Sequence, residues 1–415
     1  MMPGSSMSSS TNIKLPLSFI IFGIVTFVLA QTILLFGTDV LSIGQFRVPL
    51  VWSGAHFLLL GFAVMICMGA MYQLVPVAFL TPIWNQTFGI FQFIVTVIGF
   101  IAFAVLLGLN VPYAVYGGMI AVIGILMFIF QMLKTLTAQK EKNVMSYFVM
   151  GALTALTLAI IAGFILAWNL SFSSIVPQEN MVFTHITLGV AGWFTLLIFG
   201  FSYKLIPMFS LSHGFSMKWA KPAFFTYSIG LLMLISSFWL HHSVLQMISW
   251  FILFAGFGFF VLDVREILAK RLRKKLDKPF SFSIFAIGIG FIVHLIASLL
   301  SIFQVSDPNI WSWVVFFYIM GWIIFSILGY LYKIVPFLWW THKYSDVIGK
   351  EKVPTLKDMI NEKMSVILFT MFFIGLVGLT IGGLLGIGFL VFIFQALLTV
   401  TALLYAISVL RILFI

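Results

Sequence analysis

The amino-acid sequence predicts an all-α polytopic membrane protein with twelve transmembrane helices. Hydrophobic residues make up 62% of the 415 residues, charged residues only 8%, and the mean hydropathy is +1.18. Soluble domains, by contrast, carry roughly 25% charged residues. The apolar stretches are continuous and do not alternate with polar residues, which favours helices over a transmembrane β-barrel. One motif also occurs three times, which indicates a fold built from related units.

The repeated motif consists of two glycines, a tyrosine and a proline, with identical spacings in all copies. The copies lie 131 and 129 residues apart, which predicts three pseudo-symmetric repeats of four helices, at approximately 15–133, 146–265 and 280–411. We interpret the glycines as points of close helix contact and the prolines as helix ends. The three copies are Gly61, Gly69, Tyr72 and Pro76; Gly192, Gly200, Tyr203 and Pro207; and Gly321, Gly329, Tyr332 and Pro336.

Each predicted span has the length of about 20 residues that a bilayer core of roughly 30 Å requires. The polar residues 1–14 are predicted to be a cytoplasmic tail before a retained first helix, because no small-residue cleavage site follows that helix. Residues 15–411 are predicted to form a single membrane domain, because the loops are too short for a separate one. The spans are approximately 15–36, 52–78, 86–108, 112–133, 146–168, 182–207, 221–241, 243–265, 280–304, 309–336, 364–384 and 387–410.

The basic residues predict the orientation in the membrane. Twelve crossings place both termini on one side, and 21 of the 22 lysines and arginines fall on that same side. Only Arg47 falls on the other side. By the positive-inside rule, both termini are cytoplasmic and the protein lies in a plasma (inner) membrane. The net charge of +11 is then an orientation signal with weak attraction for anionic lipid, and it does not indicate a nucleic-acid partner. The lipid bilayer is the predicted environment.

Histidines are the candidate functional residues, because no Asp, Glu, Lys or Arg lies in the middle of a predicted span. His56, His185 and the pair His241-His242 are predicted at one depth, near the outer surface, where neutral imidazoles could bind iron or copper. His294 is predicted to lie deeper. The structural alternatives are that His294 bonds a backbone carbonyl and that His241-His242 is a solvated pair at a helix end. The single cysteine precludes an internal disulfide.

The sequence resembles the catalytic subunit (subunit I) superfamily of haem-copper oxidases and nitric oxide reductases. That superfamily has twelve helices in three arcs of four with cytoplasmic termini, and its second helix runs from a haem-ligating histidine to a Leu-Val-Pro-like turn. His56 and Leu74-Val75-Pro76 are similar to those features. The resemblance implies that His56 ligates haem b, with His185 or His294 as second ligand. It alternatively implies a copper site of His185, His241 and His242, as in the family.

This chain departs from the family at the tenth helix, which supplies histidines to both haems in the family. Residues 311–336 contain no histidine, and Phe316 stands at the position equivalent to His56. The redox tyrosine of the sixth helix is replaced by Gly189, and the proton-pathway carboxylates are missing. The resemblance therefore implies a single-haem protein with an electron-transfer, oxygen-related or nitric-oxide-related role, served by an electron donor or a small partner subunit. The alternatives are a non-enzymatic copper- or haem-handling or oxidase-assembly protein and, third, a solute transporter.

Overall fold

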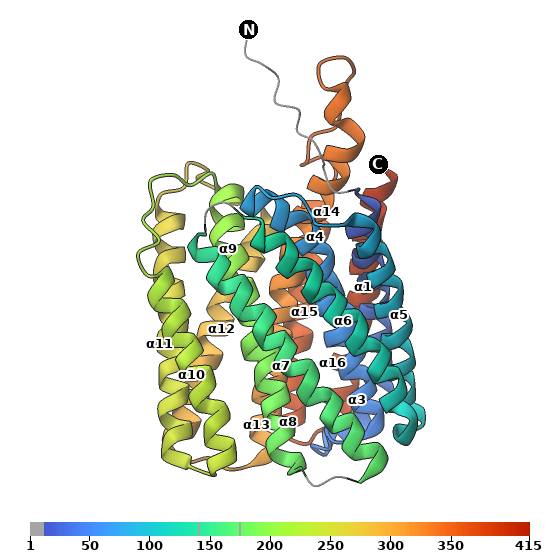
Figure 1. The fold of residues 1–415 in the computed structure, drawn as a ribbon, viewed down its shortest axis with the longest axis vertical. Helices are drawn as coiled ribbons and strands as arrows, with labels where there is room; N and C mark the ends of the chain where they lie inside the picture. The colour runs from blue at the N-terminus through green and yellow to red at the C-terminus, as the bar shows by residue number, and fades with distance from the viewer. Residues whose placement is uncertain (1–11, 140–141, 174–175) are drawn as a thin grey trace.

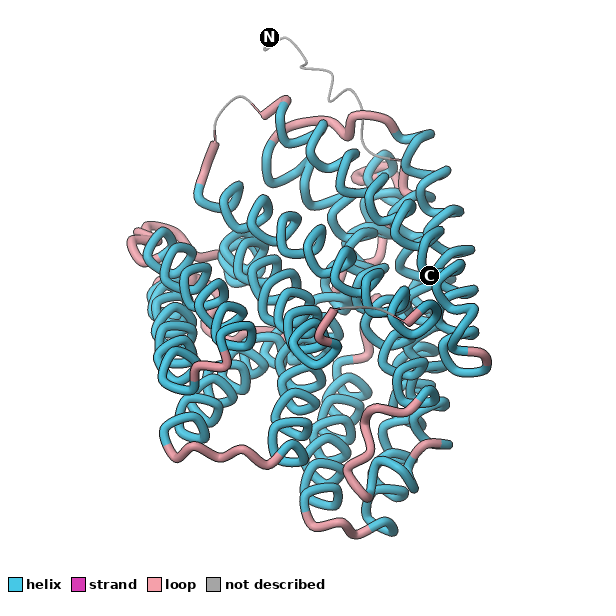
Figure 2. The backbone as a smooth tube through the Cα atoms, turned by 60° about the horizontal axis from the view of Figure 1, so that its bottom comes forward, coloured by secondary structure: helices cyan, strands magenta, loops and turns pink. Residues whose placement is uncertain are grey.

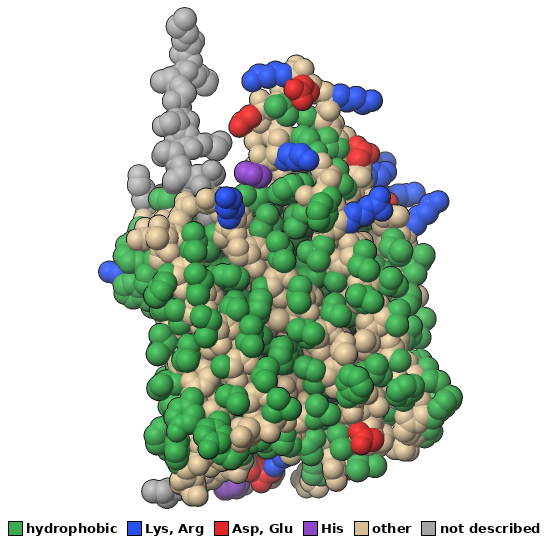
Figure 3. Space-filling view, turned by 90° about the vertical axis from the view of Figure 1, so that its right-hand side faces the viewer, with side chains coloured by type: hydrophobic (Ala, Val, Ile, Leu, Met, Phe, Trp, Pro, Cys, Tyr) green, Lys and Arg blue, Asp and Glu red, His purple; other side chains and the backbone are tan. Residues whose placement is uncertain are grey.

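The computed structural model describes residues 12–139, 142–173 and 176–415 (Figure 1). Within those residues, twelve helices are long and apolar enough to cross a membrane, and each overlaps one predicted span. Large apolar side chains remain exposed along the whole length of the bundle, and Figure 3 shows them covering its middle. An exposed apolar belt of this extent requires lipid, because water would make it unstable. The protein is therefore a multi-pass membrane protein of helices.

Nine of these spans are continuous α-helices, two of which have a short 3-10 turn at one end. Several begin with a side-chain cap on the first turn, such as Asn85, Asn143 and Asn361, whose amide oxygens accept from backbone N–H groups. They are α1 (Lys14–Phe36), α5 (Gln86–Leu109), α6 (Ala114–Thr137) after the 3-10 turn Val111–Tyr113, α7 (Val144–Phe172), α10 (Ala220–Leu240), α11 (Ser243–Ala269), α12 (Lys278–Ile302), α15 (Glu362–Leu384) and α16 (Gly388–Leu410), which the 3-10 turn Arg411–Phe414 follows. A short helix, α2 (Thr38–Ser42), lies outside these spans.

The other three spans form the centre of the molecule. Their most apolar windows are 72–78% buried, compared with 28–50% in the remaining nine spans of the described chain. Each consists of an α-helix, a π-helical segment and a second α-helix. The three are α3 (Pro49–His56), η1 (Phe57–Val64) and α4 (Met65–Phe79); α8 (Gln178–Ile186), η3 (Thr187–Phe194) and α9 (Thr195–Ser210); and α13 (Pro308–Phe317), η4 (Tyr318–Ile324) and α14 (Phe325–Tyr344), followed by the 3-10 turn Ser345–Val347.

The three π-helical segments occupy corresponding places in the three central helices. A π-helix bonds each N–H to the carbonyl five residues earlier, which makes a wider turn than the α-helix, and it often occurs at functional positions. No feature of the amino-acid pattern predicted these turns. They lie between the two ends of the bundle: Figure 1 labels α3, α8 and α13 towards one end, and α4, α9 and α14 towards the other.

The expectation that the repeated prolines end their helices was wrong. Pro76 and Pro207 lie inside α4 and α9, and each is followed by three more helical residues. The helices end where Leu80 and Leu211 adopt the left-handed conformation, with φ of 50° and 54°. Pro336 lies inside α14, which continues for eight residues. A proline removes only one backbone donor, so the final turn can still form from the remaining N–H groups.

The other nine long helices surround the three central ones, in keeping with the greater burial of the latter, and Figure 2 shows the bundle in a tilted view. Consecutive helices pack in pairs, α5 against α6, α10 against α11 and α15 against α16. The pairs are linked by contacts of α6 with α7 and of α11 with α12, and α1 packs against α16. The contact between the first and last helices includes a hydrogen bond from Gln395 Nε2 to Gln31 Oε1 of 2.9 Å. On the face seen in Figure 3, lysine and arginine side chains gather at the end that contains the C-termini of α4, α9 and α14. We call it the basic end.

Candidate functional site

His56 and His185 lie next to each other at the end of the molecule opposite the basic end. His56 is the last residue of α3, and His185 is the penultimate residue of α8. Their ring centroids are 6.3 Å apart and their ring planes differ by 20°. The two rings are part-buried. The structure therefore brings together two histidines that are 129 positions apart in sequence and belong to different predicted repeats.

Backbone carbonyl groups fix both imidazoles. His56 Nδ1 is 2.7 Å from the carbonyl oxygen of Trp52, one turn earlier, and His185 Nδ1 is 2.8 Å from that of Ala159 in α7. A carbonyl oxygen only accepts, so Nδ1 donates in both rings. In a neutral imidazole the lone pair then lies on Nε2. Histidine ligands of metals are held in this way by their second ring nitrogen.

The space around the pair depends on two residues that the sequence did not single out. The ring of Phe103, from α5, meets the His56 ring edge to face at 5.0 Å between centroids. Gly163, in α7, faces His185: a Cβ atom at this position would lie 2.7 Å from His185 Cε1. Any larger residue would displace the imidazole. A small residue facing a histidine can be recognised only when the two helices are already aligned.

An ion pair joins the two histidine-bearing helices nearer their first residues. Arg47, just before α3, lies 3.3 Å from Glu179 in the first turn of α8, and the side chains are 58% and 65% exposed. The guanidinium also lies over the ring of Phe183. An exposed pair contributes about 0–1 kcal/mol, so it orients the helix ends and does little for stability. Arg47 is the basic residue that the sequence placed on the outer side.

His294 occupies a different environment. It is fully buried in α12, and its Nδ1 lies 2.7 Å from the carbonyl oxygen of Gly290. Its Nε2 is 3.1 Å from the hydroxyl of Tyr227. Both ring nitrogens are thus hydrogen-bonded within the protein. This arrangement corresponds to the structural alternative for His294, and a second-ligand role would require breaking the bond to Tyr227.

A chain of hydrogen bonds links His294 to the central helices. Tyr227 and Tyr318 hydroxyls are 3.1 Å apart, and Tyr318 is 2.7 Å from Thr195 Oγ1. The indole of Trp322 donates to Thr195 at 3.1 Å. The Thr195 hydroxyl also donates to the carbonyl oxygen of Val190 at 3.1 Å. Buried hydrogen-bond networks rigidify a core, and this one connects α9, η4, α10 and α12.

His241 and His242 form the turn between α10 and α11. His241 ends α10 in the left-handed conformation, with φ of 50°, and its Nε2 is 3.5 Å from Asn180 Nδ2. His242 caps α11, because its Nδ1 accepts a hydrogen bond from the backbone N–H of Leu245. Both residues are exposed. Across the part of the chain that the structure describes, no three His, Cys, Asp or Glu side chains form a metal-binding group.

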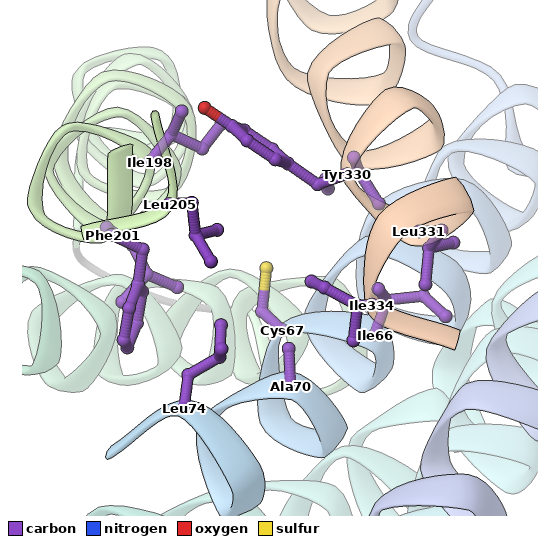
Figure 4. A pocket seen from close by; sticks show the side chains of 12 residues that line it. Ile66, Cys67, Ala70, Leu74, Ile198, Phe201, Leu205, Tyr330, Leu331 and Ile334 are labelled. Carbon is purple, nitrogen blue, oxygen red and sulfur yellow. The ribbon is translucent and has the colours of Figure 1, made fainter. Parts of the chain in front are cut away.

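The three central helices leave an apolar cavity of about 60 Å³ between α4, α9 and α14. Figure 4 shows the sulfur of Cys67 directed into it from α4, with Phe201 and Leu205 opposite. The hydroxyl of Tyr330, at its edge, is already bonded to Ser202 at 2.8 Å. The accessible surface of this cavity is apolar, unlike the polar midplane site with which a solute transporter would bind a hydrophilic substrate.

No protein-family model matches this chain, and comparison with characterised proteins found no significant match.

Proposed function

We propose that this protein is a haem-copper-oxidase-like membrane protein that binds a single haem b between His56 and His185 and serves in electron transfer. The observation that carries the proposal is the pair of nearly parallel imidazoles, 6.3 Å apart. An imidazole nitrogen binds a transition metal at about 2.0 Å, so two imidazoles that would hold one metal ion must lie close together. The 6.3 Å between the two ring centroids is compatible with such a pair.

The chain's own residues prepare this pair. Trp52 and Ala159 carbonyls hold each Nδ1–H, which leaves each Nε2 lone pair for the metal. Gly163 provides the space for the His185 ring. A haem held by both imidazoles would supply one-electron redox chemistry, which suits electron transfer better than binding of oxygen or nitric oxide. His294, with both nitrogens bonded to other groups, is assigned to the core.

The architecture in this proposal is three four-helix repeats with both termini in the cytoplasm of a bacterial-type cell. In support, the π-helical segments begin at Phe57, Thr187 and Tyr318, which are 130 and 131 positions apart. The gathering of basic side chains at one end supports the orientation by the positive-inside rule. The basic end is then the cytoplasmic one, and the histidine pair lies towards the outer side.

The first test is the optical spectrum of protein purified in detergent from haem-replete cells, together with quantification of haem and copper. We expect a Soret band, one haem per chain and a low-spin spectrum in both oxidation states. Protein that contains neither bound haem nor a Soret band, and takes up none on titration with hemin, would contradict the assignment. Copper without haem would favour the alternative of a copper-handling protein.

Substitution of Gly163 by alanine tests the space around His185. The added methyl group would lie 2.7 Å from His185 Cε1 and should turn the ring, weakening haem binding about tenfold, as expected for a disturbed ligand support. The measurement is a hemin titration followed at the Soret band. Gly189→Ala is the matched control, since a Cβ there meets nothing within 4 Å. Equal affinities of the two variants would contradict the proposed geometry.

Substitution of His294 by leucine distinguishes a structural role of this residue in the core from a role as a haem ligand. The change removes the hydrogen bonds to Gly290 and Tyr227 and should destabilise the protein by about 1–3 kcal/mol. The Soret spectrum should keep its low-spin shape and its haem content. A thermal-unfolding midpoint measured in detergent and the optical spectrum report the two effects. Conversion to a high-spin spectrum in this variant would make His294, and not His185, the second ligand.

A further inference from the structure

A second cavity, of about 320 Å³, lies at the basic end between α9, α14 and the segment that leads from α14 to α15. Phe209 and Phe337 form apolar walls, and Leu356 and Ile360 from the connecting segment close one side. Lys333, from α14, and Arg273, from the loop between α11 and α12, also line it. We call it the basic cavity. Its volume is at the lower end of the range of small-molecule sites.

The charges in the basic cavity do not balance. Asp277 forms ion pairs with both Lys333 and Arg273, so two cations share one carboxylate. The side chains of Lys333 and Asp277 are only 15% and 13% exposed. One positive charge is therefore in excess in a partly buried place, where electrostatic interactions are stronger than in water. An anion would neutralise this charge and would be drawn to it.

The connecting segment is held in place over the cavity. The indole of Trp340 donates to the carbonyl oxygen of Pro354 at 2.6 Å. Asp358 accepts hydrogen bonds from the side chain and backbone N–H of Thr355, at 2.7 and 2.8 Å. Both hydrogen bonds favour the charged carboxylate, the bond from the Thr355 side chain more than the bond from its backbone, and they hold the pKa of Asp358 below its ordinary value. The cavity wall is thus a defined structure and not a loose loop.

The shape and chemistry of the cavity indicate an amphipathic ligand. The Lys333 ammonium lies 5.3 Å from the centre of the Phe209 ring, so positive charge and apolar surface meet at one point. Basic pockets between transmembrane helices bind the phosphate groups of anionic lipids. We infer that the basic cavity binds one anionic phospholipid, with its phosphate at Lys333 and Arg273 and its apolar part along Phe209 and Phe337. Inorganic phosphate presents the same charged group as the lipid, so it is the alternative ligand that the experiment must distinguish.

Native mass spectrometry and thermal unfolding in detergent can test this inference with three additives. These are dioctanoyl phosphatidylglycerol, the zwitterionic dioctanoyl phosphatidylcholine, and inorganic phosphate. We expect one molecule of phosphatidylglycerol per chain, with a raised unfolding midpoint, and at least tenfold weaker effects of the other two additives. Stabilisation by inorganic phosphate alone, or equal binding of the two lipids, would overturn the inference.

Substitutions then locate the site. Lys333→Gln and Arg273→Gln should each weaken phosphatidylglycerol binding at least tenfold. Lys350→Gln is the control, because it deletes an exposed positive charge at the same end of the molecule, and it should leave binding unchanged. If Lys333→Gln fails to fold because the part-buried Asp277 loses one of its two partners, Arg273→Gln, which leaves the Lys333–Asp277 pair intact, replaces it. Leu356→Trp fills the cavity without changing charge and should also abolish binding. Wild-type affinity in the lysine and tryptophan variants would refute the site.

Discussion

Purified protein with alanine at His56 or at His185 is expected to lose its low-spin Soret spectrum. In the proposed site both imidazoles would hold the haem, and each is fixed by its own carbonyl bond, at 2.7 or 2.8 Å. Loss of a supporting group around a metal commonly costs about 10–100-fold in affinity, so loss of a ligand should cost at least about 100-fold. Any haem retained by a single histidine should become high-spin. Absorption and electron paramagnetic resonance spectra distinguish these states.

The controls for this prediction come from the other histidines. His242→Ala removes an exposed imidazole that caps α11, and its spectrum should match that of the wild type. A double variant of His56 and His185 should bind no haem at all. If the single variants keep a full low-spin band while His242→Ala loses it, the pair at the ends of α3 and α8 is not the haem site.

Valine in place of Gly117 should have the second largest effect, because α5 and α6 are in direct backbone contact. A Cβ atom at Gly117 would meet the backbone nitrogen of Phe103 and lie 2.6 Å from the carbonyl carbon of Ala102. Backbone cannot rotate away as a side chain can, so the two helices must separate, at a cost of about 3 kcal/mol or more. Since the Phe103 ring packs against His56, haem binding should fall as well.

The measurement is the unfolding midpoint in detergent together with haem content per chain. Gly288→Val provides the control, because this glycine is exposed in α12 and a Cβ there has no neighbour within 4 Å. The Gly288 variant should behave as the wild type. Equal stability of the two variants would show that α5 and α6 are not packed as closely as described.

Hydropathy predicted all twelve spans of the described chain because the bilayer imposes a length that any apolar run of about 20 residues reveals. The three spans that carry the repeated motif each contain a π-helical segment, which the apolar pattern did not predict. Such a segment changes the hydrogen-bond pattern without changing composition, so residues such as Phe57 and Thr187 carry no signal of it. Pro336 was misread for a related reason: proline lowers helix stability, but burial of α14 between its neighbours compensates.

Individual residues of the site could be predicted from the sequence, but the way in which the helices bring them together could not. His56 and His185 were both predicted near the outer surface at one depth, and the family resemblance implied His185 as one of two candidates for the second ligand. The roles of Gly163 and Phe103 depend on how α7 and α5 lie beside the central helices, which no local pattern expresses. His294 could not be distinguished from a ligand until its contact with Tyr227 was known.

The π-helical segments make the number of residues in each central helix more important than the identity of those residues. Each residue advances an α-helix by about 100°, so one extra residue within a wide turn fixes the angle between the two halves of a central helix. The direction in which His56 faces is therefore set relative to Gly69, Tyr72 and Pro76 by the number of residues in η1, and not by their identity. Apolar exchanges within Phe57–Val64 should be far better tolerated than the gain or loss of a single residue.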